Sequence, residues 1–361
     1  MDALDEVKNK AKRYAFLKYI LEICNTIFLL FFLFAFAKIG FSKALASRLP
    51  SLPLYLLAFY LLYFALDLPI NFYRSHVLEH RFALSNQKIG SWFFDQLKSG
   101  AISYLIVVIL AGSFYYILSK YPYSWWFWVS LFWIFFSLFL TKIVPVAVIP
   151  LFFKYRRLGD IALKERILSL ADRLEVKILD VYEIDFSKKT LKANAAFVGM
   201  GNTRRVLLAD TLKNKYTQDE IEVILAHEFA HCRMKHLLKL VFFNSTSTVA
   251  LFYLIFLSSG YSLGAFGFSS LEDLAALPVI LIYFIIFGLI TQPLSNYISR
   301  RFEKSADILA VKTTGLKNAF ISAMEKLSDQ NLADRKPHPI IKFFFFDHPP
   351  IDERIKLISK I

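Results

Sequence analysis

The chain has 361 residues, of which 56% are hydrophobic and only 20% are charged, and its formal net charge is +14 at pH 7. A soluble domain of this length would lack the polar surface needed to cover so much apolar material. The composition therefore excludes an ordinary soluble protein and indicates one that lies in the lipid bilayer. A nucleic-acid partner is not expected either, because no basic stripe interleaved with aromatic residues lies outside the apolar segments.

Six apolar segments are long enough to cross a membrane, since a helical span needs about 20 mostly apolar residues. They cover residues 19–39, 52–72, 101–118, 125–151, 237–257 and 274–294. The first is too long for a secretory signal, and no small-residue cleavage site follows it, so we expect it to be retained. The sequence predicts a mainly α polytopic membrane protein with about six transmembrane helices.

Basic residues gather on one side of the predicted membrane. This side has Lys8, Lys10, Lys12 and Arg13, the loop 73–98 with Arg74, Arg81, Lys88 and Lys98, and basic segments after Phe152 and Tyr297. The opposite loops have only Lys43, Arg48 and Lys120. The positive-inside rule therefore predicts that the basic side is cytoplasmic. The membrane would be the plasma (inner) membrane in a prokaryote, or the endoplasmic reticulum in a eukaryote.

The segment between the fourth and fifth spans is the only long one with the pattern of a soluble fold. Residues 160–174 have helical apolar spacing, residues 176–183, 194–198 and 205–208 have strand character, and residues 199–203 contain a hairpin turn signal. Thr217 and Glu220 predict a capping box that opens a further helix. The predicted organisation is a membrane domain with four spans and a cytosolic loop (1–151, loop 73–98), a catalytic segment (152–236), two further spans (237–295) and a C-terminal segment (296–361).

The capped helix contains His227, Glu228 and His231 in an H-E-x-x-H motif. Two histidines four residues apart lie one helical turn above each other, so both can reach one tetrahedral Zn²⁺ ion at about 2.0–2.1 Å. Glu228 lies on the adjacent edge, where it can take a proton from the attacking water without binding the metal. The motif predicts one catalytic zinc ion per chain; the alternative is a pair of solvated histidines on a cytosolic helix.

A catalytic zinc takes three protein ligands and leaves one position open. His236 is five residues beyond His231, so a continuous helix would point it roughly 140° away, and we expect it to be solvated or interfacial. Glu303 and Asp307 fit better, with Glu303 as ligand and Asp307 orienting a ligand histidine, although both carboxylates could simply balance neighbouring basic residues. The other candidates are His348, His76 and His80.

Five separated motifs together resemble the type I CAAX prenyl proteases, a family of integral-membrane zinc endopeptidases. They are residues 225–231, Glu303-Lys-Ser-Ala-Asp307, Asn194-Ala-Ala-Phe197 with its continuation 204–212, the ending 347–355, and residues 78–86 of the cytosolic loop. The resemblance implies a small α+β zincin-like catalytic domain inserted between spans four and five and completed by the C-terminal segment. It also implies that Glu303 is the third ligand, supported by Asp307, and that the spans enclose a chamber.

The resemblance further implies roles that spacing alone does not give. Asn194 and His348 would stabilise the tetrahedral intermediate, with Arg354 in support. A peptide or protein substrate, prenylated or otherwise membrane-associated, would bind as an added strand along Asn194, Ala195, Ala196 and Phe197. Without the resemblance, Asn194 would be interpreted as a turn cap and His348 as part of a helix start.

Two other functions remain open at this stage. An HtpX-like quality-control protease usually has two spans before the zinc helix, whereas this sequence has four. A transporter or scaffold with a structural zinc would close the site with four protein ligands, commonly cysteines. Only Cys232 is near the motif, and its helix position beside His231 points it away from the metal.

Overall fold

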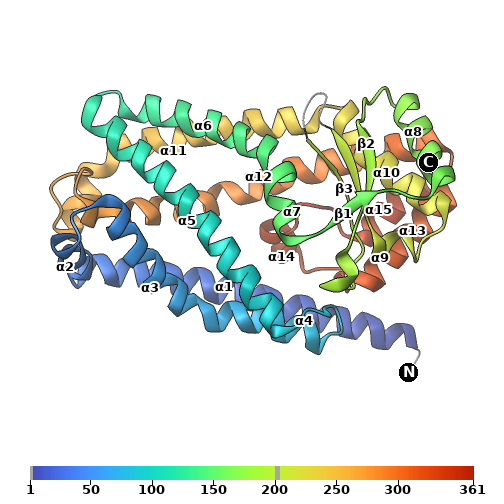
Figure 1. Cartoon of the computed structure of the whole chain (residues 1–361), viewed down its shortest axis with the longest axis horizontal. Coiled ribbons are helices and arrows are strands. Elements are labelled where there is room, and N and C mark those ends of the chain that lie inside the picture. The colour runs from blue at the N-terminus through green and yellow to red at the C-terminus, as the bar shows by residue number, and fades with distance from the viewer. Residues whose placement is uncertain (1–2, 200–203) are drawn as a thin grey trace.

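Figure 1 shows a computed structural model of the chain, which describes residues 3–199 and 204–361. Long helices run side by side along the molecule, and the sheet and most of the short helices gather at one end. The described residues form six helices long and apolar enough to cross a membrane, which confirms the predicted number: Glu6–Lys38, Leu52–Arg81, Ile89–Lys120, Trp125–Phe152, His236–Phe266 and Leu274–Thr314.

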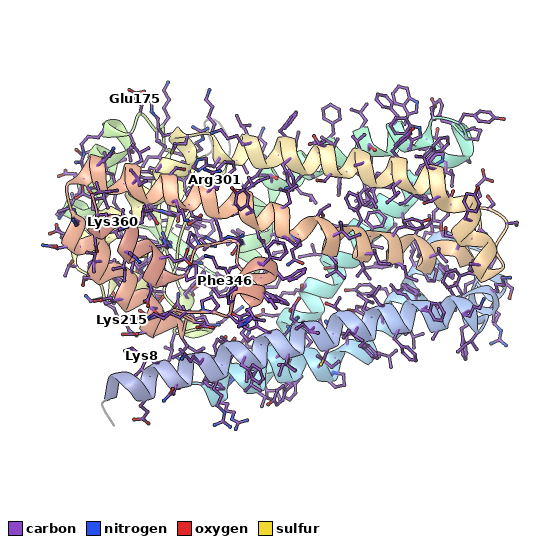
Figure 2. All side chains as sticks on the ribbon, turned by 180° about the vertical axis from the view of Figure 1, so that it is seen from behind. Lys8, Glu175, Lys215, Arg301, Phe346 and Lys360 are labelled. Carbon is purple, nitrogen blue, oxygen red and sulfur yellow. The ribbon has the colours of Figure 1, made fainter. Side chains whose placement is uncertain are left out.

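The first four spans and the short helix α2 between the first two consist of several helical pieces. These are α1 (Ala3–Lys38), α2 (Phe41–Arg48), α3 (Leu52–Phe72), the π-helical η1 (Tyr73–Val77), α4 (Leu78–Arg81), α5 (Ile89–Lys120), α6 (Trp125–Ile143), the π-helical η2 (Val144–Val148) and α7 (Ile149–Phe152). Apolar side chains project outward along the long helices, as Figure 2 shows from behind. Phe31, Phe135, Phe242 and Ile290 are each more than 60% exposed. Such a surface, along helices of this length, is typical of segments that face lipid.

A four-stranded sheet forms the base of the catalytic segment, in the order β1-β2-β4-β3. Its strands are β1 (Tyr155–Arg157), β2 (Asp180–Ile184), β3 (Ala195–Val198) and β4 (Arg205–Ala209); β2 and β4 are parallel, and the other two pairs are antiparallel. β1 was not predicted, because three residues with two exposed arginines show no alternation. The predicted strand 176–183 begins later, because Glu175 is left-handed (φ 54) and Val176 N–H still bonds the Ala171 carbonyl of the preceding helix. The predicted turn 199–203 falls largely on residues 200–203, which lie outside the described residues.

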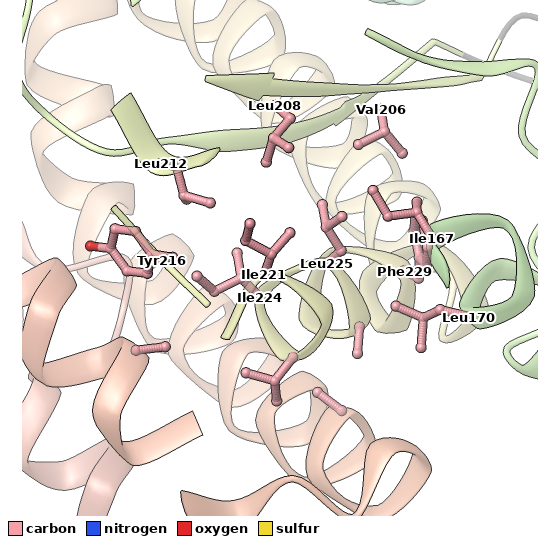
Figure 3. Close-up of a cluster of buried hydrophobic side chains, with 14 of the residues drawn as sticks. Ile167, Leu170, Val206, Leu208, Leu212, Tyr216, Ile221, Ile224, Leu225 and Phe229 are labelled. Carbon is pink, nitrogen blue, oxygen red and sulfur yellow. The ribbon is translucent and has the colours of Figure 1, made fainter. Parts of the chain in front are cut away.

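The zinc-motif helix α10 (Gln218–Arg233) lies at the centre of this segment. It packs against α8 (Ile161–Arg173), against β3 and against α12 (Leu277–Thr314). Leu225 and Phe229 of α10 meet Val206 and Leu208 of the sheet in a fully buried apolar cluster (Figure 3). The motif therefore lies on a helix whose side chains are almost all buried between Glu220 and Ala230.

The remaining elements complete the structure around α10. They are the short helix α9 (Asp210–Lys213), the span α11 (His236–Phe266), the 3₁₀ turn η5 (Leu274–Ala276), and the C-terminal helices α13 (Lys317–Asn331), α14 (Pro339–Phe345) and α15 (Ile351–Ser359). α13 packs on α10 and α15, whereas α14 and α15 pack on α12. The α12 helix has 38 residues and is about 57 Å long, whereas the hydrocarbon core of a bilayer is about 30 Å thick. Its second half therefore extends beyond the membrane and into the catalytic segment.

Residues 73–98, predicted as a loop, are mostly helical (η1, α4 and the start of α5) and connect the membrane helices to the catalytic segment. Glu79 accepts a hydrogen bond from Tyr14 of α1 and forms an ion pair with Lys192 at 2.7 Å. Asp95 forms an ion pair with Lys189. Glu79 and Asp95 therefore hold residues 73–98 against α1 and the catalytic segment.

Glu220 anchors the start of the zinc-motif helix. The predicted capping box is present: Thr217 Oγ1 accepts from Glu220 N–H at 3.2 Å, and Glu220 Oε2 accepts from Thr217 N–H at 2.8 Å. The same carboxylate accepts from Ser322 and Lys326 of α13 at 2.6 and 2.8 Å. Burial opposes ionisation of Glu220, but these partners outweigh it and lower its pKa below the ordinary value.

We expect Glu220→Ala to destabilise the protein by about 2 kcal/mol, because a cap and charge-assisted hydrogen bonds are lost together. Thermal unfolding in detergent measures this loss. Since the folded pKa is lowered, the stabilisation by Glu220 is present above the ordinary carboxyl pKa and is lost as the pH falls through the folded value. Glu325→Ala, on the exposed side of α13, is the matched control and should unfold like the wild type. Equal melting temperatures for Glu220→Ala and the control would contradict this account.

Candidate metal centre

Three side chains from α10 and α12 meet with the geometry of a zinc site. His227 Nε2 and His231 Nε2 are 3.1 Å apart, and the Glu303 carboxylate oxygens lie 3.2 Å from the first and 3.1 Å from the second. Ligands placed tetrahedrally at about 2.0–2.1 Å from one zinc ion would be about 3.3 Å from each other. The observed separations therefore fit a zinc ion bound by these three groups.

Two further observations support this fit. Glu303 Oε2 is buried without a hydrogen-bond partner, which is costly unless a cation binds there. Burial opposes protonation of His227, but the carboxylates of Asp307 and Glu303 beside it outweigh this effect and raise its pKa to about 9. The site thus has a strong negative potential that favours a cation.

Asp307 holds His227 in the required orientation. Its Oδ1 lies 2.8 Å from His227 Nδ1, so the ring carries its proton there and presents Nε2 to the other two ligands. Asp307 is completely buried and receives two hydrogen bonds from Arg354, at 2.8 and 2.6 Å. Arg354 lies on α15, so the C-terminal segment contributes to the centre.

Glu228 lies beside His227 in the sequence and lines two cavities that reach the centre. It is the one residue between Ile221 and Ala230 of α10 that is not buried. It lines both a cavity of about 290 Å³ that reaches His227 and another of about 230 Å³ that reaches His231. Among the described residues, three side chains could bind the metal, so a fourth coordination position would stay open. A structural zinc, in contrast, is usually closed by four protein ligands.

The larger cavity also brings together two residues distant in the sequence. Asn194, just before β3, and His348, just before α15, both line it. His348 Nδ1 bonds Asp347 Oδ1 at 2.8 Å, and its Nε2 lies 3.4 Å from Glu303 Oε1. Among the described residues, β3 (Ala195–Val198), with Ala195, Ala196 and Phe197, pairs with β4 and forms an edge of the sheet.

His236 is not solvated, so that part of the expectation was wrong. His236 is only 1% exposed, and its Nδ1 lies 3.1 Å from His231 Nδ1. The helical extrapolation failed because α10 ends at Arg233 and Lys235 adopts a left-handed conformation (φ 57), which turns the chain before α11 begins. A lysine gives no sequence signal for such a turn.

The other histidine candidates lie elsewhere. His76 and His80, on η1 and α4, contact each other with ring centroids 4.3 Å apart, and neither belongs to the cluster. Cys232 is partly buried against the hydrophobic core.

Comparisons with known proteins agree with this geometry. The model of peptidase family M48 matches residues 159–361, and that of the CAAX prenyl protease N-terminal region, described as five membrane helices, matches residues 3–154. A Bacillus subtilis protein named uncharacterized metalloprotease YhfN is 33% identical over 77% of this chain and 66% of its own length. CAAX prenyl protease 1 of Saccharomyces cerevisiae is 30% identical over 82% of this chain and 69% of its own length.

The fold is also shared with a solved structure. The crystal structure of S. mikatae Ste24p superposes with a TM-score of 0.89 at 26% identity, covering 99% of this chain and 90% of that one. The aligned part of this chain spans about two thirds of the length of the two relatives named above. The chain therefore belongs to peptidase family M48, as a membrane zinc metallopeptidase of the CAAX prenyl protease type.

Proposed function

We propose that this protein is a zinc metalloendopeptidase that cleaves membrane-associated peptides, with the metal held by His227, His231 and Glu303. The observation that carries the proposal is the mutual separation of 3.1–3.2 Å among their ligand atoms. When bound, zinc lowers the pKa of a water molecule it binds and polarises the scissile carbonyl. The residues around the ion would orient the substrate, move the protons and stabilise the developing charge.

Glu228 is our candidate for general base. It lines both cavities beside the proposed ligands, where an attacking water and a peptide carbonyl would meet. It would accept the proton of the water and deliver it to the leaving amine. Asn194 and His348, across the larger cavity, would stabilise the negative charge on the carbonyl oxygen.

The free edge of β3 is our candidate for the substrate site. A peptide added there would form main-chain hydrogen bonds with Ala195–Val198 and pass beside Glu228. The adjoining cavity is lined mainly by apolar side chains, among them Val223, Ile224, Phe320 and Met324. An aliphatic substrate side chain would fit that cavity best.

The substrate would reach the site from the membrane surface. Only Met234 and Lys235 separate α10 from the span α11, so the metal centre lies close to the bilayer. The charge distribution favours the cytoplasmic face. The relatives named CAAX prenyl protease 1 make a prenylated C-terminal peptide the first candidate.

Glu228→Gln should leave zinc content unchanged and remove turnover, because the amide cannot accept the proton. General-base loss of this kind lowers kcat by about 10²–10⁴-fold. Metal analysis and cleavage of a fluorescent peptide by the purified protein measure the two effects. Retained activity in zinc-loaded Glu228→Gln would refute the mechanism.

Asn194→Ala should lower kcat by about 10²–10³-fold with a smaller change in KM, as expected for loss of a group that acts in the transition state. Zinc content and melting temperature are measured in parallel and should stay at wild-type values. A change confined to KM would instead assign Asn194 to substrate binding alone.

A farnesylated reporter peptide should be cleaved faster than the same peptide without the lipid, because the lipid concentrates the substrate at the bilayer. A chelator should abolish both reactions, and stoichiometric zinc should restore them. The protein is reconstituted in nanodiscs, and casein is included as an unanchored substrate. Equal rates on both peptides would contradict the lipid preference, whereas activity that survives complete zinc removal would contradict the metalloprotease assignment.

A further inference from the structure

We propose that His236 is a positioning residue that fixes the tautomer and orientation of His231. This inference rests on the proposed zinc ligands and adds a residue to their support. His227 has such a support in Asp307, as described above. His231 makes no contact with Asp307, and its Nδ1 meets His236 instead.

The place of His236 is tightly determined. The left-handed turn at Lys235 (φ 57, ψ 34) brings the first residue of α11 back toward the last turn of α10. The His236 ring then stacks on Phe302, with centroids 4.4 Å apart and an interplanar angle of 6°. Phe302 directly precedes Glu303, so the stack fixes His236 to the helix that carries the third ligand.

The hydrogen bonds that link Ser305, His236 and His231 allow a consistent assignment of the ring protons. Ser305 Oγ–H donates to the Phe302 carbonyl at 2.8 Å, so its oxygen is free to accept from His236 Nε2–H, at 3.4 Å. His236 Nδ1 is then unprotonated and accepts from His231 Nδ1–H at 3.1 Å.

This assignment leaves the lone pair of His231 Nε2 directed at Glu303 and His227, each 3.1 Å away. Because a ligand histidine usually donates its other ring N–H to an acceptor that sets its orientation, His236 takes the part that a carboxylate or carbonyl takes elsewhere. A neutral acceptor adds no negative charge beside the ion. His236 would therefore orient His231 without weakening the ability of the metal to polarise a carbonyl.

Two variants distinguish the effect of His236 on the orientation of His231 from the effect of its ring packing on Phe302. His236→Phe keeps an aromatic ring on Phe302 and removes the acceptor, whereas His236→Asn keeps an acceptor oxygen near the position of Nδ1. We expect His236→Phe to lower zinc affinity about 10–100-fold and His236→Asn to stay close to the wild type. Competition with a chromophoric chelator measures the affinity, and the d–d spectrum of cobalt-substituted protein should change in His236→Phe alone. A purely structural role would lower the melting temperature without this contrast between the variants.

Wild-type zinc affinity in His236→Phe, or equal losses in both variants, would overturn the inference while leaving the proposed function intact. If the wild type binds no zinc, the proposed function fails and this inference fails with it. Histidine side-chain ¹⁵N NMR of the zinc-loaded wild type needs no variant. It should find His236 protonated at Nε2 and His231 protonated at Nδ1, and the opposite tautomer of His236 would also contradict the proposal.

Discussion

The close packing of α10 against α12 is the constraint on which the metal centre depends. The buried face of α12 carries Glu303, Ala306, Asp307 and Ala310 at successive turns, and both alanines are fully buried. The distance between two packed helices depends on the side chains at their contact, so small residues beside the two carboxylates allow a close approach. Larger residues at 306 and 310 would move Glu303 away from the histidines of α10.

The same packing places two carboxylates where neither would be stable alone. Glu303 and Asp307 are 4% and 0% exposed, and an unpaired charge at such depth is strongly unfavourable. Arg354 compensates Asp307, and the two motif histidines compensate Glu303 in part. A cation bound by Glu303 and the two histidines would complete the compensation, so metal binding should also stabilise the contact between α10 and α12.

Features set by neighbouring residues could be predicted from the sequence. The spans, the Thr217–Glu220 capping box and the positions of His227 and His231 on one helical face depend only on local composition and spacing. The roles of Glu303 and Asp307 required the family resemblance, because a four-residue spacing alone also fits a surface pair. β1 and the position of His236 were not predictable, since β1 is defined by its pairing with β2 and His236 by a left-handed lysine.

Both helices that form the site are connected to membrane spans, and this fixes the height of the centre above the bilayer. The apolar part of α12 ends near Leu294, and Glu303 follows nine residues later in the same helix, a rise of about 13 Å. On the other side, α11 enters the membrane directly after His236. The three proposed ligands therefore lie within a few helical turns of the apolar parts of α11 and α12. The short connection of α10 to α11, and the continuity of α12 from the apolar segment to Glu303, therefore limit how far the metal centre can lie from the bilayer.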